Sequence, residues 1–228
     1  MMAVSLDKAV PWGRGFDEYV RMFNLSAANL TSRILDCAGG PASFNAEVHR
    51  RGGQVISCDP IYQFSAAEIA RRIEETRDAI LKMTHEAREH FVWREIASID
   101  DLARLRTSAM QLFLADLPAG LAKGRYRAAE LPALPFRDNE FDLALCSHFL
   151  FTYSDILPPE FHLASIRELC RVAREARIFP LLAGFGSERS SHLAAIIATL
   201  ASEDYRCDIR RVPYEFQKGG NEMLRVSR

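Results

Sequence analysis

The sequence contains few cysteines, and none of them stands close to another in the chain. Its five cysteines are scattered over 228 residues, mostly inside apolar runs, and no C-x-x-C pair occurs. This arrangement argues against a structural zinc site and against a disulfide framework. We expect reduced, buried thiols, which are usual in cytosolic proteins.

The sequence also lacks an excess of charge of either sign. Its formal net charge is -1, and 48% of its residues are hydrophobic. Bulk attraction to a polyanion is therefore weak, and the composition is not that of a disordered chain. We expect a folded protein without a nucleic-acid partner.

Long apolar segments are missing as well. Residues 1–15 lack the hydrophobic core of a signal peptide, and no apolar run approaches the ~18–20 residues that span a bilayer. The sequence therefore predicts a cytoplasmic protein without a membrane segment. Its length suits a single α/β domain over residues 1–228, and leaves open whether the protein is a monomer or a homodimer.

Segments with strand character alternate with amphipathic helices along the chain. Strands are predicted at 33–38, 54–58, 125–129, 141–147, 177–183, 207–214 and 222–227, and helices at 16–30, 42–51, 160–174 and 188–203. This alternation predicts an α/β fold with a mostly parallel sheet, closed by a terminal hairpin with an antiparallel last strand.

Residues 62–124 hold far more chain than a crossover between two parallel strands needs. Ser65 and Glu68 form a capping box that opens one helix of this segment, with an apolar stripe running to Phe91. A second helix is predicted to start at Ser98. We predict a helical cap inserted between the second and third strands.

A glycine-rich turn follows the first predicted strand. Ala38, Gly39 and Gly40 are small enough to let a cofactor approach the backbone, and Asp36 precedes them. The alternative is an ordinary tight turn between a strand and a helix.

An acid stands at the end of the second predicted strand. Asp59, followed by Pro60, lies about 20 residues beyond the glycine turn, where a carboxylate accepts hydrogen bonds from the ribose hydroxyls of an adenosine cofactor. The alternative role of Asp59 is to cap the helical turn that Pro60 begins.

The segment from Glu130 to Asp142 identifies the cofactor more closely. It contains Leu134-Pro135-Phe136, Asp138 and Phe141-Asp142 and leads into the strand that ends in Cys146-Ser147-His148. Together with the glycine turn and Asp59, it resembles the class I S-adenosylmethionine-dependent methyltransferases. The resemblance implies a Rossmann-like seven-stranded sheet and S-adenosylmethionine as the cofactor, with a Glu at the position where the family more commonly has an Asp that contacts the adenine.

The resemblance also implies which residues contact the cofactor, by their position in the motifs. These are Arg14, Tyr19, Asp36, Ala38, Gly39, Gly40, Asp59, Pro60, Glu130, Leu131, Cys146 and Ser147.

The methyl acceptor is expected beyond the fourth strand. His148 is the candidate base or acceptor-orienting group, and Tyr153 is the next candidate. Four further residues are candidates for acceptor contact from the segment after this strand and from the terminal hairpin: Phe149, Tyr214, Lys218 and Asn221. A small-molecule acceptor is expected, but the acceptor atom is not specified.

Two other functions stay open. One is a methyltransferase-like binding protein without catalysis, since alanines replace the outer two glycines of the family pattern. The other is an NAD(P)-dependent enzyme, although the chain lacks a G-x-G-x-x-G turn. No metal site is expected, because His85 and His90 are five residues apart and would point to different faces of a helix.

Overall fold

The computed structural model describes residues 11–228, within which seven strands form one sheet in the order β3-β2-β1-β4-β5-β7-β6. The strands are β1 (Arg33–Cys37), β2 (Gln54–Cys58), β3 (Tyr126–Arg127), β4 (Leu143–Ser147), β5 (Glu175–Phe179), β6 (Arg206–Arg211) and β7 (Glu222–Ser227). The first five are parallel to one another, and β7 is antiparallel to both β5 and β6. This confirms the predicted α/β fold, a Rossmann-like and mostly parallel sheet with an antiparallel last strand.

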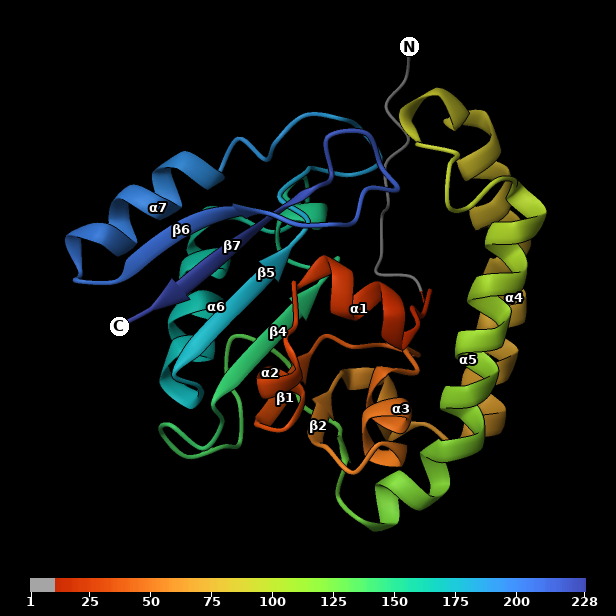
Figure 1. Ribbon diagram of the computed structural model, residues 1–228, viewed down its shortest axis with the longest axis horizontal. Coiled ribbons are helices and arrows are strands. Elements are labelled where there is room, and N and C mark those ends of the chain that lie inside the picture. The colour runs from red at the N-terminus through yellow and green to blue at the C-terminus, as the bar shows by residue number, and fades with distance from the viewer. Residues whose placement is uncertain (1–10) are drawn as a thin grey trace.

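Helices cover both faces of the sheet (Figure 1). The helices α1 (Phe16–Met22), α2 (Ala27–Leu30) and α3 (Phe44–Arg50) lie in front of it, and α6 (Pro159–Val172) lies behind it. The helix α7 (Leu193–Ser202) packs on α6 and β6. Alternate residues of each strand enter opposite cores: Leu143 and Leu145 of β4 face α1 and α3, whereas Ala144 and Cys146 face α6.

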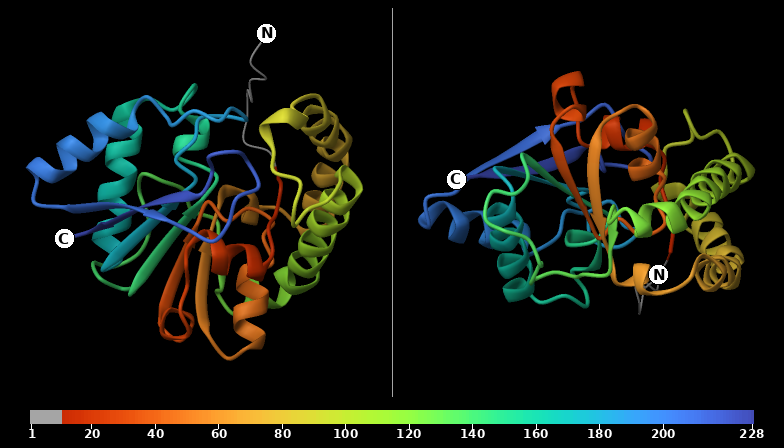
Figure 2. Two further views of the ribbon diagram at one scale, coloured as in Figure 1. Left: turned by 45° about the horizontal axis from the view of Figure 1, so that its top comes forward. Right: turned by 90° about the horizontal axis from the view of Figure 1, so that it is seen from below.

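Two long helices occupy the segment between β2 and β3. These are α4 (Ala66–Glu86), capped by Ser65, and α5 (Ile99–Ala122), capped by Ser98, so both predicted helix starts are confirmed. The two helices stand side by side along the β3 side of the sheet (Figures 1 and 2). Apolar side chains of both pack against Tyr62 and Tyr126, which fixes the pair to the end of the sheet.

The structure corrects several predicted boundaries. The apolar stripe predicted to run through Phe91 ends earlier, because α4 stops at Glu86 and Phe91 follows the short 3-10 helix η2 (Arg88–His90). The helix predicted at 16–30 is broken at Asn24, whose φ of 46° is left-handed. The strand predicted at 177–183 ends before Pro180, which has no N–H to continue the ladder.

Among the described residues, no helix combines the length and the apolar character needed to cross a membrane.

Candidate functional site

A cavity of about 1120 Å³ opens at the carboxyl ends of the parallel strands. Its floor is formed by the segments that follow β1, β2, β4 and β5, and residues of α4 and α5 line its side. Cavities that hold one drug-sized ligand measure about 300–1,000 Å³. The cavity therefore has room for two molecules side by side.

The turn after β1 is held in a shape that exposes its backbone to the cavity. Ala38 and Gly40 are both left-handed, with φ of 55° and 52°. The Gly40 amide donates a hydrogen bond to Asp59 Oδ2 over 3.0 Å, and the Tyr62 hydroxyl donates to the Gly40 carbonyl over 2.8 Å. A Cβ at Gly39 would overlap the Asp36 carboxylate, so only glycine fits there. Ala38, Gly39 and Gly40, which were predicted to contact the cofactor, all line the cavity.

Asp59 caps the helical turn that Pro60 begins, which was the alternative role predicted for it, and it also lines the cavity. Its Oδ1 accepts a hydrogen bond from the Ile61 amide over 2.9 Å, which caps the 3-10 helix η1 (Pro60–Gln63). Burial raises the pKa of Asp59 despite these amide hydrogen bonds. A carboxylate has about four lone-pair sites, so both oxygens can accept further hydrogen bonds from a ligand. Pro60, Glu130 and Leu131 lie on the cavity lining with it.

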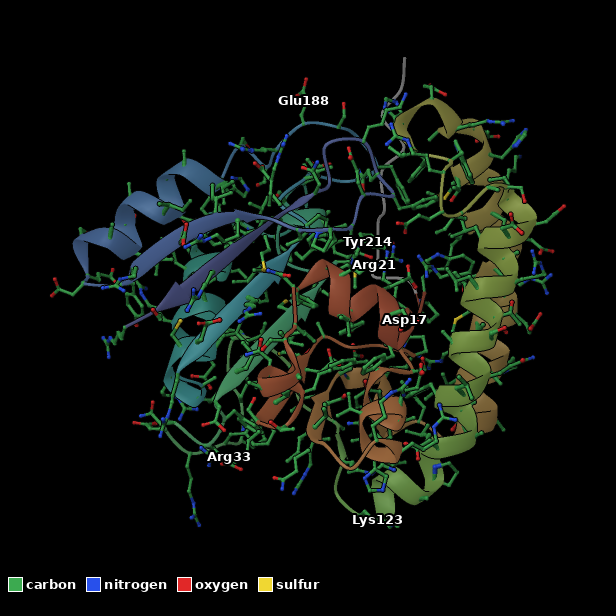
Figure 3. All side chains as sticks on the ribbon, in the orientation of Figure 1. Asp17, Arg21, Arg33, Lys123, Glu188 and Tyr214 are labelled. Atoms are coloured by element: carbon green, nitrogen blue, oxygen red, sulfur yellow. The ribbon has the colours of Figure 1, made fainter. Side chains whose placement is uncertain are left out.

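A buried group of charges lies next to the cavity between α1 and α5. The Arg106 guanidinium, 1% exposed, donates to both oxygens of Glu18, which also accepts a hydrogen bond from the Tyr214 hydroxyl over 2.8 Å. Burial opposes ionisation of Glu18, but Arg106 and Arg14 outweigh it and lower its pKa to about 2. Figure 3 shows Tyr214 beside Arg21 above α1, with the guanidinium carbon 5.4 Å from the ring centre.

Arg14 adds a second positive charge to this group. It lines the cavity, donates to the Trp12 carbonyl over 3.3 Å, and has a buried Nε without a hydrogen-bond partner among the described residues. Burial and the charge of Arg106 lower its pKa. Two guanidinium groups thus face one carboxylate, so the site carries a net positive charge that an anionic ligand group would neutralise. Sequence reasoning missed Glu18 and Arg106, which no local pattern links.

The end of β4 brings Ser147 and His148 to the centre of the cavity floor. His148 is left-handed, with φ of 50°, and its amide donates to the Phe179 carbonyl over 2.6 Å. Its Nδ1 lies 2.9 Å from Ser147 Oγ. Burial, reinforced by the charges of Arg14 and Arg106, lowers the pKa of His148 well below its ordinary value. The imidazole is therefore neutral at pH 7, and one of its ring nitrogens carries a lone pair that can accept a hydrogen bond.

Four further candidate residues from the sequence also line the cavity: Tyr19, Phe149, Tyr153 and Tyr214. Tyr153 follows His148 on the 3-10 helix η3 (Phe151–Tyr153), and its side chain is buried.

Two residues predicted to contact the cofactor do not line the cavity. Asp36 is buried beneath the glycine turn, where it accepts hydrogen bonds from Tyr19 over 3.1 Å and Ser57 over 2.9 Å. Burial raises its pKa to about 7. Cys146 points into the core shared with α6, because neighbouring strand residues alternate between faces. Both residues therefore support the site from below.

The structure also leaves Lys218 and Asn221 outside the cavity. Lys218 is exposed and its amide donates to the His90 carbonyl over 2.8 Å, while the Asn221 side chain donates to Glu215. The hairpin tip that carries them instead docks on the loop between α4 and α5. The Val92 amide donates to the Phe216 carbonyl over 2.7 Å.

This docking brings together two segments that lie far apart in the sequence (Figure 2). The rings of Phe91 and Phe216 stack with their centres 4.8 Å apart, and both line the cavity. The sequence placed Phe91 on an apolar stripe but gave no indication that this segment meets the hairpin tip.

Among residues 11–228, no cluster of three or more His, Cys, Asp or Glu side chains is arranged to hold a metal ion. His85 is exposed, and His90 is partly exposed beside the hairpin tip.

Comparison with solved structures finds methyltransferases at low sequence identity. Magnesium protoporphyrin IX methyltransferase from Synechocystis PCC 6803, solved with bound SAH, is 13% identical with a TM-score of 0.45, and the match covers 88% of this chain and 76% of that one. A SAM-dependent methyltransferase from Aquifex aeolicus is 10% identical with a TM-score of 0.42, and the match covers 92% and 90% of the two chains.

No protein-family model matches the sequence. Among curated proteins, the uncharacterized protein MJ0045 of Methanocaldococcus jannaschii is 35% identical over 229 residues, which cover 100% of both chains. At this identity and coverage the two proteins share one ancestry and one fold. The chain therefore belongs to the family of the Methanocaldococcus jannaschii protein MJ0045.

Proposed function

We propose that this protein is an S-adenosylmethionine-dependent methyltransferase that acts on a small molecule enclosed in the cavity. One observation carries the proposal: the glycine turn, Asp59 and Glu130 follow β1, β2 and β3, which are neighbours in the sheet. Three cofactor-binding elements separated by up to 90 residues of chain therefore share one wall of one cavity, as ligand sites at the carboxyl edge of an α/β sheet do.

The residues of this wall fit each part of the cofactor. Asp59 is placed to accept the ribose hydroxyls, and Glu130 with Leu131 to contact the adenine. The exposed backbone of Gly39 and Gly40 permits close approach of the amino-acid portion. Arg14, with its unpartnered Nε, is placed to bind the cofactor carboxylate. When bound, the cofactor supplies a methyl group on a positively charged sulfur, which a nucleophile displaces in line.

The remaining residues serve to position the acceptor and to exclude water. The loop after α4 and the hairpin tip, joined by backbone hydrogen bonds, each bring a ring to the cavity lining, and an acceptor packed against Phe91 and Phe216 would displace water from the reacting atoms. His148 is the base if the acceptor atom arrives protonated. Tyr153, in the same segment, is the second candidate for this role.

The enclosure also supports a small acceptor over a macromolecule. Phe91 and Phe216 stack on each other and both line the cavity, whose volume of about 1120 Å³ suits the cofactor and a small acceptor.

The experiment is to incubate the protein with methyl-labelled S-adenosylmethionine and a cell extract, and then to separate small molecules, proteins and nucleic acids. We expect the label in the small-molecule fraction. Label in protein or nucleic acid would contradict the small acceptor. Binding of the cofactor without transfer into any fraction would favour the non-catalytic alternative.

A further inference from the structure

The charged side chains of the cavity lining come from segments that precede β4 in the chain. These are the N-terminal segment, the turn after β2, the cap helices and the segment after β3: Arg14, Asp59, Arg71, Arg72, Glu75, Arg106 and Glu130. From Ser147 onward, the described lining residues carry no Asp, Glu, Lys or Arg, and His148 is the one titratable imidazole among them. The half of the cavity lined by the segments after β4 therefore receives no charged side chain from the described residues, and the charges of Arg14 and Arg106 reach it only at His148.

The sheet order gives this division a functional meaning. The strands β3, β2 and β1 carry the proposed cofactor wall, and β4 and β5 continue the sheet on its other side. The uncharged half is thus the space left for the acceptor, with Ser147 and His148 at the boundary.

Aromatic rings form the walls of this half. Phe149 and Phe161 pack edge to face with their centres 6.1 Å apart, and both line the cavity. Phe185 packs against Phe91, with ring centres 6.4 Å apart, and Phe91 stacks on Phe216; these three rings also line the cavity. Rings from several separate segments of the chain therefore meet around one space. Such walls favour flat aromatic ligands, because rings stack or pack edge to face on one another.

One proton acceptor faces this apolar space. His148 Nδ1 lies 2.9 Å from Ser147 Oγ, so this ring nitrogen is engaged within the protein. His148 Nε2 is the ring nitrogen that remains to take a proton from an acceptor.

We infer that the acceptor is an uncharged aromatic ring compound that is methylated on a ring hydroxyl, with His148 as the base. The inference rests on the proposed methyltransferase function and adds the class of its substrate. In the reaction, the hydroxyl oxygen bonds to the methyl carbon and the carbon–sulfur bond breaks with its electron pair passing to sulfur. The hydroxyl proton passes to His148 Nε2.

The binding test uses two probes that differ in one group, 2-naphthol and 2-naphthoate. The protein is first saturated with S-adenosylhomocysteine, so that Arg14 is occupied, and calorimetry then measures the affinity of each probe. We expect 2-naphthol to bind at least about tenfold more tightly than 2-naphthoate, because the carboxylate would be buried without a partner. Equal or tighter binding of 2-naphthoate would overturn the inference.

Two matched variants locate the probe. Phe149→Leu keeps an apolar side chain but removes a ring from the wall, and should weaken 2-naphthol binding about tenfold without changing the affinity for S-adenosylhomocysteine. Phe136→Leu removes a ring that packs on Phe141 outside the cavity, and should leave both affinities unchanged. If both variants bind 2-naphthol like the wild type, the acceptor does not lie against this wall.

The base is tested with His148→Gln and labelled methyl transfer to 2-naphthol. We expect transfer to fall about 100-fold while both molecules still bind. Transfer at the wild-type rate by the variant, or none by the wild type with both molecules bound, would overturn the assignment of a hydroxyl acceptor with His148 as its base. Failure to bind S-adenosylhomocysteine at the first step would instead refute the proposed function, so the two failures are distinguishable.

Discussion

Replacing Glu18 by Gln should destabilise the protein strongly, because it removes the one carboxylate that Arg106 binds. Glu18 is 3% exposed and accepts hydrogen bonds from Arg106 and Tyr214. The variant would leave the Arg106 and Arg14 guanidinium groups buried without an opposite charge. Removing one partner of a buried ion pair typically costs about 3–5 kcal/mol.

The pKa of Glu18 gives a second way to calculate how much stability the Glu18→Gln variant should lose. It is about 2 in the folded protein and 4.5 for an ordinary glutamate, which corresponds to about 3 kcal/mol of stability at neutral pH. A lowered carboxyl pKa stabilises the folded state above the unfolded pKa of 4.5. This stabilisation is lost as the pH falls toward 2, so about 2 kcal/mol should remain at pH 3.5.

Urea unfolding at pH 7 and pH 3.5 measures the difference between wild type and Glu18→Gln. Because both proteins share every other titrating group, the change of this difference with pH reports on Glu18. Glu95→Gln is the matched control, since Glu95 pairs with Arg21 on the surface and its loss should cost less than about 1 kcal/mol. A Glu18→Gln variant within about 1 kcal/mol of wild type at pH 7 would refute the reasoning.

Asp59→Ala should weaken S-adenosylhomocysteine binding about tenfold or more in calorimetry, because it removes the acceptor for the ribose hydroxyls. Unchanged affinity would show that the ribose does not bind at Asp59. Asp36→Asn should flatten the pH dependence of stability. Burial raises the pKa of Asp36 to about 7, so the free energy of unfolding of the wild type falls by roughly 4 kcal/mol as the pH rises from 4 toward 7 and above. Urea unfolding at pH 5 and pH 8 should detect part of this fall in the wild type and none of it in Asp36→Asn. Cys146→Ser should lower the free energy of unfolding by about 1–3 kcal/mol without affecting ligand binding, because it buries a hydroxyl in an apolar core. Lys218→Gln should leave both affinities unchanged, and weaker binding of either ligand would place the hairpin tip in the site.

The fold follows from local signals that the sequence carries in full. The alternation of strands and helices predicts the parallel sheet, and Ser65 and Ser98 mark two helix starts by their own side-chain hydrogen bonds. The residues at strand ends could be predicted to meet, because the carboxyl ends of parallel strands share one edge. This reasoning brought Gly40, Asp59 and His148 to one cavity.

The side of the backbone on which a residue points was harder to predict. A strand side chain changes face with every residue, so the face of Asp36 and Cys146 depends on where each strand sits in the sheet. Cys146 is buried while its neighbour Ser147 reaches the cavity, and Asp36 is buried because its carboxylate lies beneath Gly39 of the turn after β1.

Contacts between distant segments could not be predicted at all. Glu18 and Arg106 are 88 residues apart and lie on different helices, so their pairing depends on how the cap packs on the sheet. The same holds for Lys218, whose turn binds the loop after α4 instead of facing the cavity.

Calorimetric titration of the folded protein with S-adenosylhomocysteine and, separately, with NAD tests the central claim most directly. We predict that S-adenosylhomocysteine binds one molecule per chain, through the wall formed by the glycine turn, Asp59 and Glu130, and that NAD does not bind. Binding of NAD in its place, or no binding of S-adenosylhomocysteine by folded protein, would contradict the account.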